Sequence, residues 1–153
     1  MHFEPVVNYL PHDPPMILID QIIDVTDKEA ICQVAVDSNG VLAPFLNKKN
    51  ELPAWFALEM MAQTIGVWQG WYAKKTQKDI HLGLLLGGRG FKTAMPSYPL
   101  NTILTIHVTL LLLDTKLASF DCRLIVNDKE MATARLNVYQ PDDVELKQFM
   151  GKD

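Results

Sequence analysis

The segment from Leu52 to Ala73 constrains the fold most, because Glu59 is its only charged residue. The segment lacks the strict alternation of a strand, and Pro53 suits the first turn of a helix. We therefore predict one long helix from Pro53 to about Lys75, with Lys74 and Lys75 at its negative end. A helix that is apolar nearly all round has to be covered on more than one side, so the rest of the chain is expected to wrap around it.

Glu59 is the first candidate for a functional group. A carboxylate is costly to bury unless it is paired or takes part in chemistry. Desolvation raises the pKa of a carboxylic acid toward neutrality, where the acid can act as a general acid or base. The alternative is a structural carboxylate that is hydrogen-bonded to the backbone or to Gln63, one turn further along the helix. The residues alone leave both interpretations open.

The remaining segments are predicted to be mainly strands. Period-2 alternation and turn residues delimit strands at 17–25, 30–36, 81–93, 101–113, 116–126 and 130–139, and a short helix is expected at 5–10. This pattern predicts an α+β fold with one antiparallel sheet and one helix packed against it. We expect a single domain over 1–153, with a tail from about 141 that frays.

Turn and glycine positions refine this prediction. Prolines at 11, 14 and 15 favour an extended loop around His12. Glycines at 87, 88 and 90 predict a bulge or a close backbone approach within a strand. Gly66 and Gly70, within the helix, predict close approach of the sheet. The Asn127–Asp128 turn is expected to join the last two strands as a hairpin.

Composition excludes several classes of function. Apolar residues make up 48% of the chain and the net charge is −4, so the chain as a whole does not favour nucleic acid. The two cysteines are expected to be buried thiols, and the four histidines lack metal-ligand spacing, so we expect no metal site. Polar residues within the long helix argue against a membrane span, and no signal-peptide pattern is present. We expect a cytoplasmic protein.

Two motifs resemble those of the hot-dog-fold 3-hydroxyacyl-acyl carrier protein dehydratases. The segment Leu10–Asp20 resembles that family's Leu-Pro-His-Arg-x-Pro-Phe-Leu-Leu-Val-Asp, and Pro53–Gln63 resembles its Pro-Gly-Val-x-x-x-Glu-Ala-x-Ala-Gln. The stretch from Gly88 to Lys92 is similar to a glycine-to-Arg-Phe-Lys stretch of the family. The resemblance spans about 9–140, and the nearest variant is the dehydratase-like subunit of aryl polyene biosynthesis.

The resemblance implies a hot-dog fold, in which an antiparallel sheet wraps around one long central helix and the sheets of two subunits continue into each other. It also implies dehydration of (3R)-hydroxyacyl thioesters on acyl carrier protein to trans-2-enoyl thioesters, without a cofactor. In the family a His from one subunit and a Glu from the other move the protons, and N–H groups at the helix start hold the thioester oxygen.

Carried onto this sequence, the family Glu becomes Glu59, and the Pro-Gly step makes the Ala54 N–H the expected oxyanion donor. Gln63 and Gly88 complete the expected substrate-binding set. Trp55 and Phe56, beside the helix start, are the best candidates for lining an acyl tunnel, with ordinary helix core as the alternative.

The basic residues Arg89 and Lys92 are candidates for docking the acidic carrier protein, with solvated surface charge as the alternative.

The sequence departs from the family at the catalytic histidine. The family's His lies fourteen residues before the Glu, a position that Phe45 occupies here, and the chain from Pro44 to Pro53 contains no His. Three explanations are open: His12 is a substitute base, a hot-dog partner in a heterodimer supplies the imidazole, or the site is degenerate. A homodimer, an acyl thioesterase in which Glu59 activates water, and a catalytically silent partner subunit remain alternatives.

Overall fold

The computed structural model describes residues 3–6, 9, 17–76, 84–114 and 117–139. In chain order the elements are β1 (Gln21–Val25), β2 (Glu29–Ala35), the 3₁₀ turn η3 (Ala43–Phe45), β3 (Leu52–Pro53), α1 (Phe56–Lys75), β4 (Leu84–Thr93), β5 (Ser97–Tyr98), β6 (Ile103–Leu113), β7 (Leu117–Val126) and β8 (Lys129–Tyr139). Residues 10–16, which include His12, and the tail from 140 lie outside the described residues.

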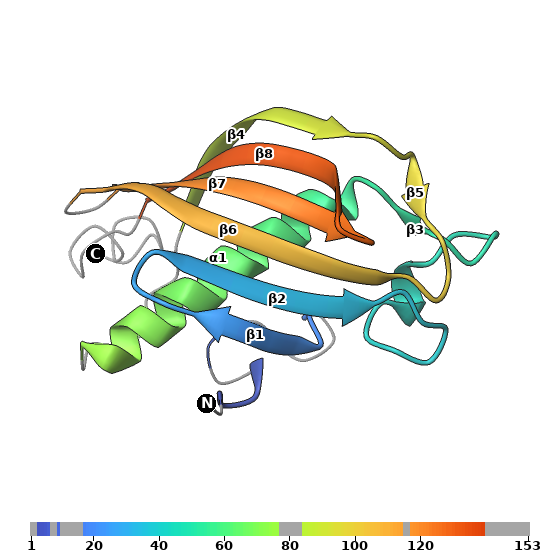
Figure 1. Ribbon diagram of the computed structural model, residues 1–153, viewed down its shortest axis with the longest axis horizontal. Helices are drawn as coiled ribbons and strands as arrows, with labels where there is room; N and C mark the ends of the chain where they lie inside the picture. Colours follow the sequence, from blue (N-terminus) through green and yellow to red (C-terminus); the bar gives the residue numbers. More distant parts are fainter. Residues whose placement is uncertain (1–2, 7–8, 10–16, 77–83, 115–116, 140–153) are drawn as a thin grey trace, which may run out of the picture.

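Six strands form one antiparallel sheet in the order β1-β2-β6-β7-β8-β4. The sheet curves over one side of α1, which packs against β2, β6, β7 and β8 (Figure 1). The short strands β3 and β5 pair separately, next to the start of α1. One antiparallel sheet with a single long helix against it is the predicted α+β arrangement.

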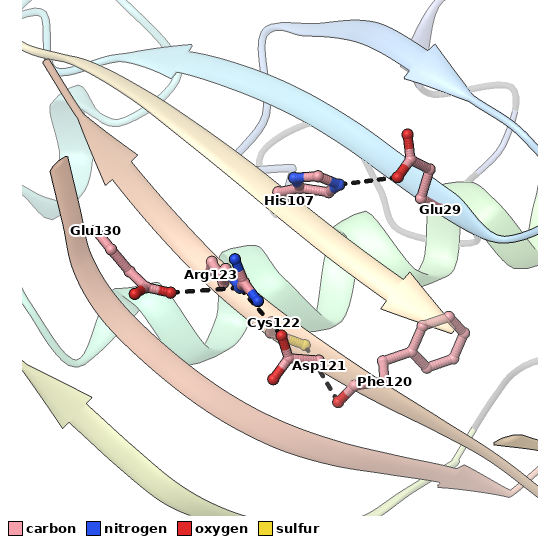
Figure 2. Close-up of polar contacts among 7 residues, drawn as sticks. All are labelled: Glu29, His107, Phe120, Asp121, Cys122, Arg123 and Glu130. Atoms are coloured by element: carbon pink, nitrogen blue, oxygen red, sulfur yellow. Dashed lines mark hydrogen bonds and ion pairs between the residues drawn. The ribbon is translucent and has the colours of Figure 1, made fainter. Parts of the chain in front are cut away.

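The core lies between α1 and the concave face of the sheet. Alternate residues of β6 face inward and are fully buried, among them Leu104, Ile106 and Val108, as the period-2 pattern predicts. The residues between them face outward, where His107 Nε2 lies 3.1 Å from Glu29 Oε2. This contact joins the neighbouring strands β6 and β2 on the outer face of the sheet (Figure 2).

The same outer face carries a second charged group. Arg123 Nε lies 3.1 Å from Asp121 Oδ2 and 3.3 Å from Glu130 Oε1, so one guanidinium forms ion pairs with two carboxylates (Figure 2). Between these outward residues, Cys122 points into the core. Burial, with a smaller contribution from the nearby Asp121 charge, raises the pKa of its thiol to about 12. Burial likewise raises the pKa of Cys32 to about 12, so both cysteines are buried neutral thiols, as predicted.

The predicted helix start was wrong by three residues. Pro53 belongs to β3, which pairs with Ser97 of β5, and α1 begins only at Phe56. The residues that follow Pro96 form the second of these two short strands, β5. None of the helices that the structure describes combines the length and hydrophobicity needed to cross a bilayer.

The first predicted strand is shorter than expected, because β1 begins at Gln21 and not at 17. Residues 17–19 are buried against the core instead. The predicted helix at 5–10 lies partly outside the described residues, and its described part shows only a turn in which the Tyr9 N–H donates to the Val6 carbonyl at 2.9 Å.

Glycine positions have specific packing reasons. A Cβ on Gly70 would lie 2.3 Å from the carbonyl oxygen of Tyr9, so this glycine admits the N-terminal segment. The prediction that Gly70 admits the sheet was therefore wrong. A Cβ on Gly88 would lie 2.5 Å from Leu136 Cδ2, so β4 packs closely on β8. Register shifts on both sides of Gly88 and a φ of +68° at Gly90 confirm the predicted bulges in β4.

The predicted hairpin between β7 and β8 is confirmed. Its turn residues Asn127 and Asp128 both have positive φ, at 51° and 64°. A two-residue hairpin turn with both residues in the left-handed region matches the twist of the flanking strands, and Asn and Asp tolerate this region better than most residues.

Candidate active site

Glu59 lies in the first turn of α1, three residues after the helix begins at Phe56. Its side chain is exposed in the single chain, whereas both interpretations of the sequence assumed a buried carboxylate. The physical reason is that the sheet covers only one side of α1. Met60, Met61 and Thr64 face the covered side and are fully buried, whereas Glu59 faces away from it. Any further covering of this carboxylate comes from outside the described residues.

Gln63 holds the Glu59 carboxylate from one turn further along the helix. Its Nε2 donates to Glu59 Oε1 at 3.1 Å, and its Oε1 accepts a hydrogen bond from the Leu18 N–H at 2.8 Å. The side chain is 1% exposed. The hydrogen bond between Gln63 and Glu59 that the spacing predicted is therefore present, and Gln63 binds protein groups at both ends.

The predicted oxyanion donor is already occupied. The Ala54 N–H donates to the Pro96 carbonyl at 2.9 Å, as part of the contact between β3 and β5, so the prediction for this group was wrong. Within the described residues, the N–H groups of Trp55 and Phe56 donate no hydrogen bond. These two groups lie at the positive end of the α1 dipole, which makes them the available anion-binding donors of this helix.

Aromatic side chains surround the start of α1. Trp55 is 67% exposed, which is unusual for a tryptophan, and its ring centroid lies 6.0 Å from that of half-buried Phe56. The ring of Phe45, from η3, lies 5.3 Å from Phe56 on its other side. Phe45 stands fourteen residues before Glu59, where the resemblance to the dehydratases places a histidine, and its ring moves no proton.

The described residues supply no imidazole beside Glu59. His107 is bonded to Glu29 on the outer face of the sheet, and the sheet separates it from α1 (Figure 2). His12 lies outside the described residues. Of the described residues before and after it, Tyr9 packs on Gly70 and Leu18 binds Gln63, two helical turns away.

Gly88, Arg89 and Lys92 lie on β4, one of the two edge strands of the described sheet. Arg89 lies directly opposite Arg135 of β8, and both are exposed. Among the described residues, neither these two arginines nor Lys92 forms an ion pair. They adjoin a hollow of about 340 Å³ on the outer face, lined by Arg89, Gly90, Asp121, Thr133, Ala134 and Arg135. The close packing against Leu136 explains why position 88 is a glycine. The expected part of Gly88 in substrate binding stays a prediction.

Sequence reasoning missed two residues that organise the site. Leu18 and Pro96 act through backbone groups, and their partners Gln63 and Ala54 are far away in sequence. No side-chain pattern could have indicated either contact. In the part of the chain that is described, no three His, Cys, Asp or Glu side chains are grouped so as to hold a metal ion.

The chain is similar to a known protein family and to several solved structures. The family model described as ApeP-like, ApeP dehydratase, matches residues 4–151. A chain of the structure "The Dehydratase Heterocomplex ApeI:P from Xenorhabdus doucetiae" is 45% identical to this one, with a TM-score of 0.92. The match covers 99% of this chain and 100% of that chain. No curated protein matches.

More distant structures share the fold. The phenylacetic acid degradation protein PaaI of Thermus thermophilus, in a mutant form, is 11% identical, with a TM-score of 0.60 over 79% of this chain and 92% of that chain. A hypothetical thioesterase of Streptococcus pneumoniae with coenzyme A is 12% identical, with a TM-score of 0.62 over 79% of this chain and 84% of its own. These likenesses show the hot-dog fold alone. The family model and the 45% identical chain go further, and they show that this protein belongs to the ApeP-like family of dehydratases.

Proposed function

We propose that this chain is the Glu59-bearing subunit of a two-chain dehydratase, which converts (3R)-hydroxyacyl thioesters on acyl carrier protein to trans-2-enoyl thioesters. The observation that carries the proposal is the position of Glu59. Its carboxylate lies in the first turn of α1, hydrogen-bonded to Gln63. It is close in sequence to the N–H groups of Trp55 and Phe56, which donate no hydrogen bond to another described residue. An acid beside an oxyanion-binding helix start is what this elimination requires.

In the proposed reaction an imidazole removes the α-proton of the thioester. The negative charge that develops on the thioester oxygen is stabilised by the Trp55 and Phe56 N–H groups and by the helix dipole. Glu59 gives its proton to the departing 3-hydroxyl group, which leaves as water while the C2–C3 double bond forms. The imidazole then holds the α-proton and Glu59 is ionised, so one proton passing from the imidazole to Glu59 resets the site.

We assign the imidazole to a second hot-dog chain. The 45% identical relative is described as part of a dehydratase heterocomplex, and Phe45 stands here where the family has its histidine. The exposure of Glu59 and Trp55 also favours a partner, because a carboxylate and a large aromatic ring at one helix start form an incomplete pocket in the single chain. A partner chain that covers this end of α1 would exclude water from the reacting groups.

The proposal predicts that His12 is not the general base of the reaction. In the complex of this chain with its hot-dog partner, His12→Ala should retain kcat within about threefold of the parent, because the partner supplies the base. Removing the general base itself would lower kcat on the order of 10²-fold or more. Formation of the enoyl thioester from a (3R)-hydroxybutyryl thioester measures this, and release of free thiol is followed in parallel. A loss of 10²-fold or more in His12→Ala would transfer the base to this chain, and thiol release in place of enoyl product would indicate thioester hydrolysis.

Carrier-protein docking is assigned to the exposed cations of β4. Arg89 and Lys92 are unpaired in the described part of the chain, and Arg135 adds a third positive charge beside them. Acyl carrier proteins are acidic, so charge complementarity favours this strip as the docking surface.

Charge reversal tests this surface. Arg89→Glu with Lys92→Glu should raise KM for a carrier-linked substrate by roughly 3- to 10-fold at low salt, the size expected for a few exposed ion pairs. kcat should stay unchanged, and the difference should shrink as salt is added. A small thioester without carrier protein is the substrate control, and Lys28→Glu with Lys129→Glu, two exposed lysines elsewhere, is the protein control. An equal rise in KM with the control pair would remove this surface from docking.

A further inference from the structure

The start of α1 is attached to the chain beside β5. The Ala54 N–H donates to the Pro96 carbonyl at 2.9 Å, and the Ala54 carbonyl accepts from the Ala57 N–H, in the first helical turn, at 2.9 Å. The strands β3 and β5 lie beside this helix start (Figure 1). The N–H groups of Trp55 and Phe56, which are the proposed oxyanion donors, follow Ala54 directly in the sequence. Their positions therefore depend on how β3 is held on β5.

The backbone fixes this pair of strands only loosely. Each strand contains two residues, with Leu52 opposite Tyr98 and Pro53 opposite Ser97. Pro53 has no N–H group to donate, and an isolated pair of strands is marginally stable even when it is longer. Leu52 and Tyr98 are fully buried, but apolar burial is non-directional. A directional side-chain contact between the two segments is therefore expected to set their exact offset.

Ser97 makes such a contact with Glu51, the residue just before β3. Its Oγ donates to Glu51 Oε1 at 2.5 Å, which is the short distance typical of strong hydrogen bonds from a hydroxyl to a carboxylate. The backbone of Glu51 is itself fixed by Asn47. The Glu51 N–H donates to Asn47 Oδ1 at 3.0 Å, and the Glu51 carbonyl accepts from the Asn47 N–H at 2.9 Å. Ser97 thus connects β5 to an acceptor whose backbone is held in place.

We infer that Ser97 is a positioning residue, whose hydrogen bond to Glu51 fixes β3 on β5 and thereby holds the Trp55 and Phe56 N–H groups where the thioester oxygen becomes negative. This inference rests on the proposed function, in which these N–H groups stabilise that charge. Donors that are already in place stabilise a transition state best, because nothing has to reorient as the charge develops. Ser97 contacts no reacting atom, and it acts on the rate only through the start of α1.

Replacement of the Ser97 hydroxyl tests this role. In the complex with the hot-dog partner, Ser97→Ala should lower kcat by about 10- to 10²-fold, because a displacement of about 1 Å costs on the order of 10²-fold and a smaller one costs less. KM should change little, since the lost stabilisation arises only in the transition state. Ser97→Thr keeps the hydroxyl and suits a strand, so it should retain most of the parent kcat. Enoyl-thioester formation over a range of substrate concentrations measures both constants.

A double-mutant cycle with Glu51 shows whether the effect passes through this hydrogen bond. Glu51→Ala removes the acceptor and should lower kcat as much as Ser97→Ala does. Because both variants delete the same hydrogen bond, the double variant should lose little more than either single variant. Independent effects would multiply the two losses, and that result would overturn the inference.

Ser119→Ala is the matched control for a purely structural role. Ser119 Oγ donates to Asn137 Oδ1 at 2.7 Å between β7 and β8, so this variant also loses a hydrogen bond from a serine on a strand. Loss of one such bond should lower Tm by about 1–6 °C in either serine variant. At one temperature below both Tm values, a positioning role predicts a lower kcat in Ser97→Ala only. A structural role predicts the parent kcat in both variants.

The outcomes distinguish this inference from the proposed function. If Glu59→Gln is active, Glu59 is not the acid and the proposed function fails. If Glu59→Gln is inactive while folded Ser97→Ala keeps kcat within about threefold of the parent, well short of the loss that misplacement produces, the positioning role is overturned and the proposed function stands. An equal loss in Ser97→Thr and Ser97→Ala overturns it too. Should Ser97→Ala not fold, Glu51→Ala decides through its kcat measured below its Tm.

Discussion

Replacing Glu59 by glutamine in the complex is expected to lower kcat by about 10²- to 10⁴-fold, which is the range that a positioned general acid or base contributes. The amide of the variant has no proton to give to the departing hydroxyl group. Its size and shape match those of the original side chain, so substrate binding should change little. The measurement is the rate of enoyl-thioester formation at saturating substrate, with KM determined for the same samples.

The loss in this variant should not come from unfolding. Glu59 is exposed in the chain, and the oxygen of the new amide still accepts from Gln63 Nε2, so Tm should stay within a few degrees of the parent. Glu29→Gln is the matched control, because Glu29 lies on the outer face of the sheet with His107. We expect that control to keep the parent kcat. Turnover of Glu59→Gln within about threefold of the parent, well short of a general acid's contribution, would contradict the proposed role of this carboxylate.

Gly70→Ala is expected to destabilise the fold although alanine favours helices. The new Cβ would lie 2.3 Å from the Tyr9 carbonyl oxygen, closer than a real contact allows, and the opposing atom belongs to the backbone. Either the N-terminal segment stays and is strained, at about 1–3 kcal/mol, or it lifts away. In the second case the burial of Tyr9, which is 5% exposed, is lost at about 1.5–3 kcal/mol.

The gain in helix propensity offsets only about 1 kcal/mol of this destabilisation. The expected net change is therefore a loss of about 0.5–2 kcal/mol in the free energy of unfolding, or about 1–8 °C in Tm for a chain of this size. Urea and thermal unfolding measure it, with Gln69→Ala at the preceding residue as the control, which should change stability by less than about 0.5 kcal/mol. A Gly70→Ala variant as stable as the parent would mean that Tyr9 does not pack on this glycine.

Much of the fold could be predicted because its signals are local. In β6, alternation over eleven residues places Leu104, Ile106 and Val108 on the buried face, and the turn Asn127–Asp128 fixes where β7 ends. The long apolar run with a single acid predicted α1. Each of these features depends on neighbouring residues and on a period of the backbone, which a sequence displays directly.

The features that could not be predicted depend on contacts between distant segments. The late start of α1 arises because Pro53 pairs with Ser97, and the bond from Leu18 to Gln63 joins residues 45 positions apart. Both contacts use backbone groups, which every residue type offers. The exposure of Glu59 was missed for another reason. The apolar character of α1 predicts covering on more than one side, but a sequence does not indicate whether its own chain or a partner covers the second side.

The division of the site between two chains is tested most directly by turnover of the purified chain with and without its hot-dog partner. The partner is obtained by co-purification from the native cell, and enoyl-thioester formation is followed at equal chain concentrations. We predict no turnover above background for this chain alone and turnover when the partner is added. We predict none when the partner is added to the Glu59→Gln variant of this chain. Full turnover by this chain alone would contradict the account, because the chain would then contain both the acid and the base.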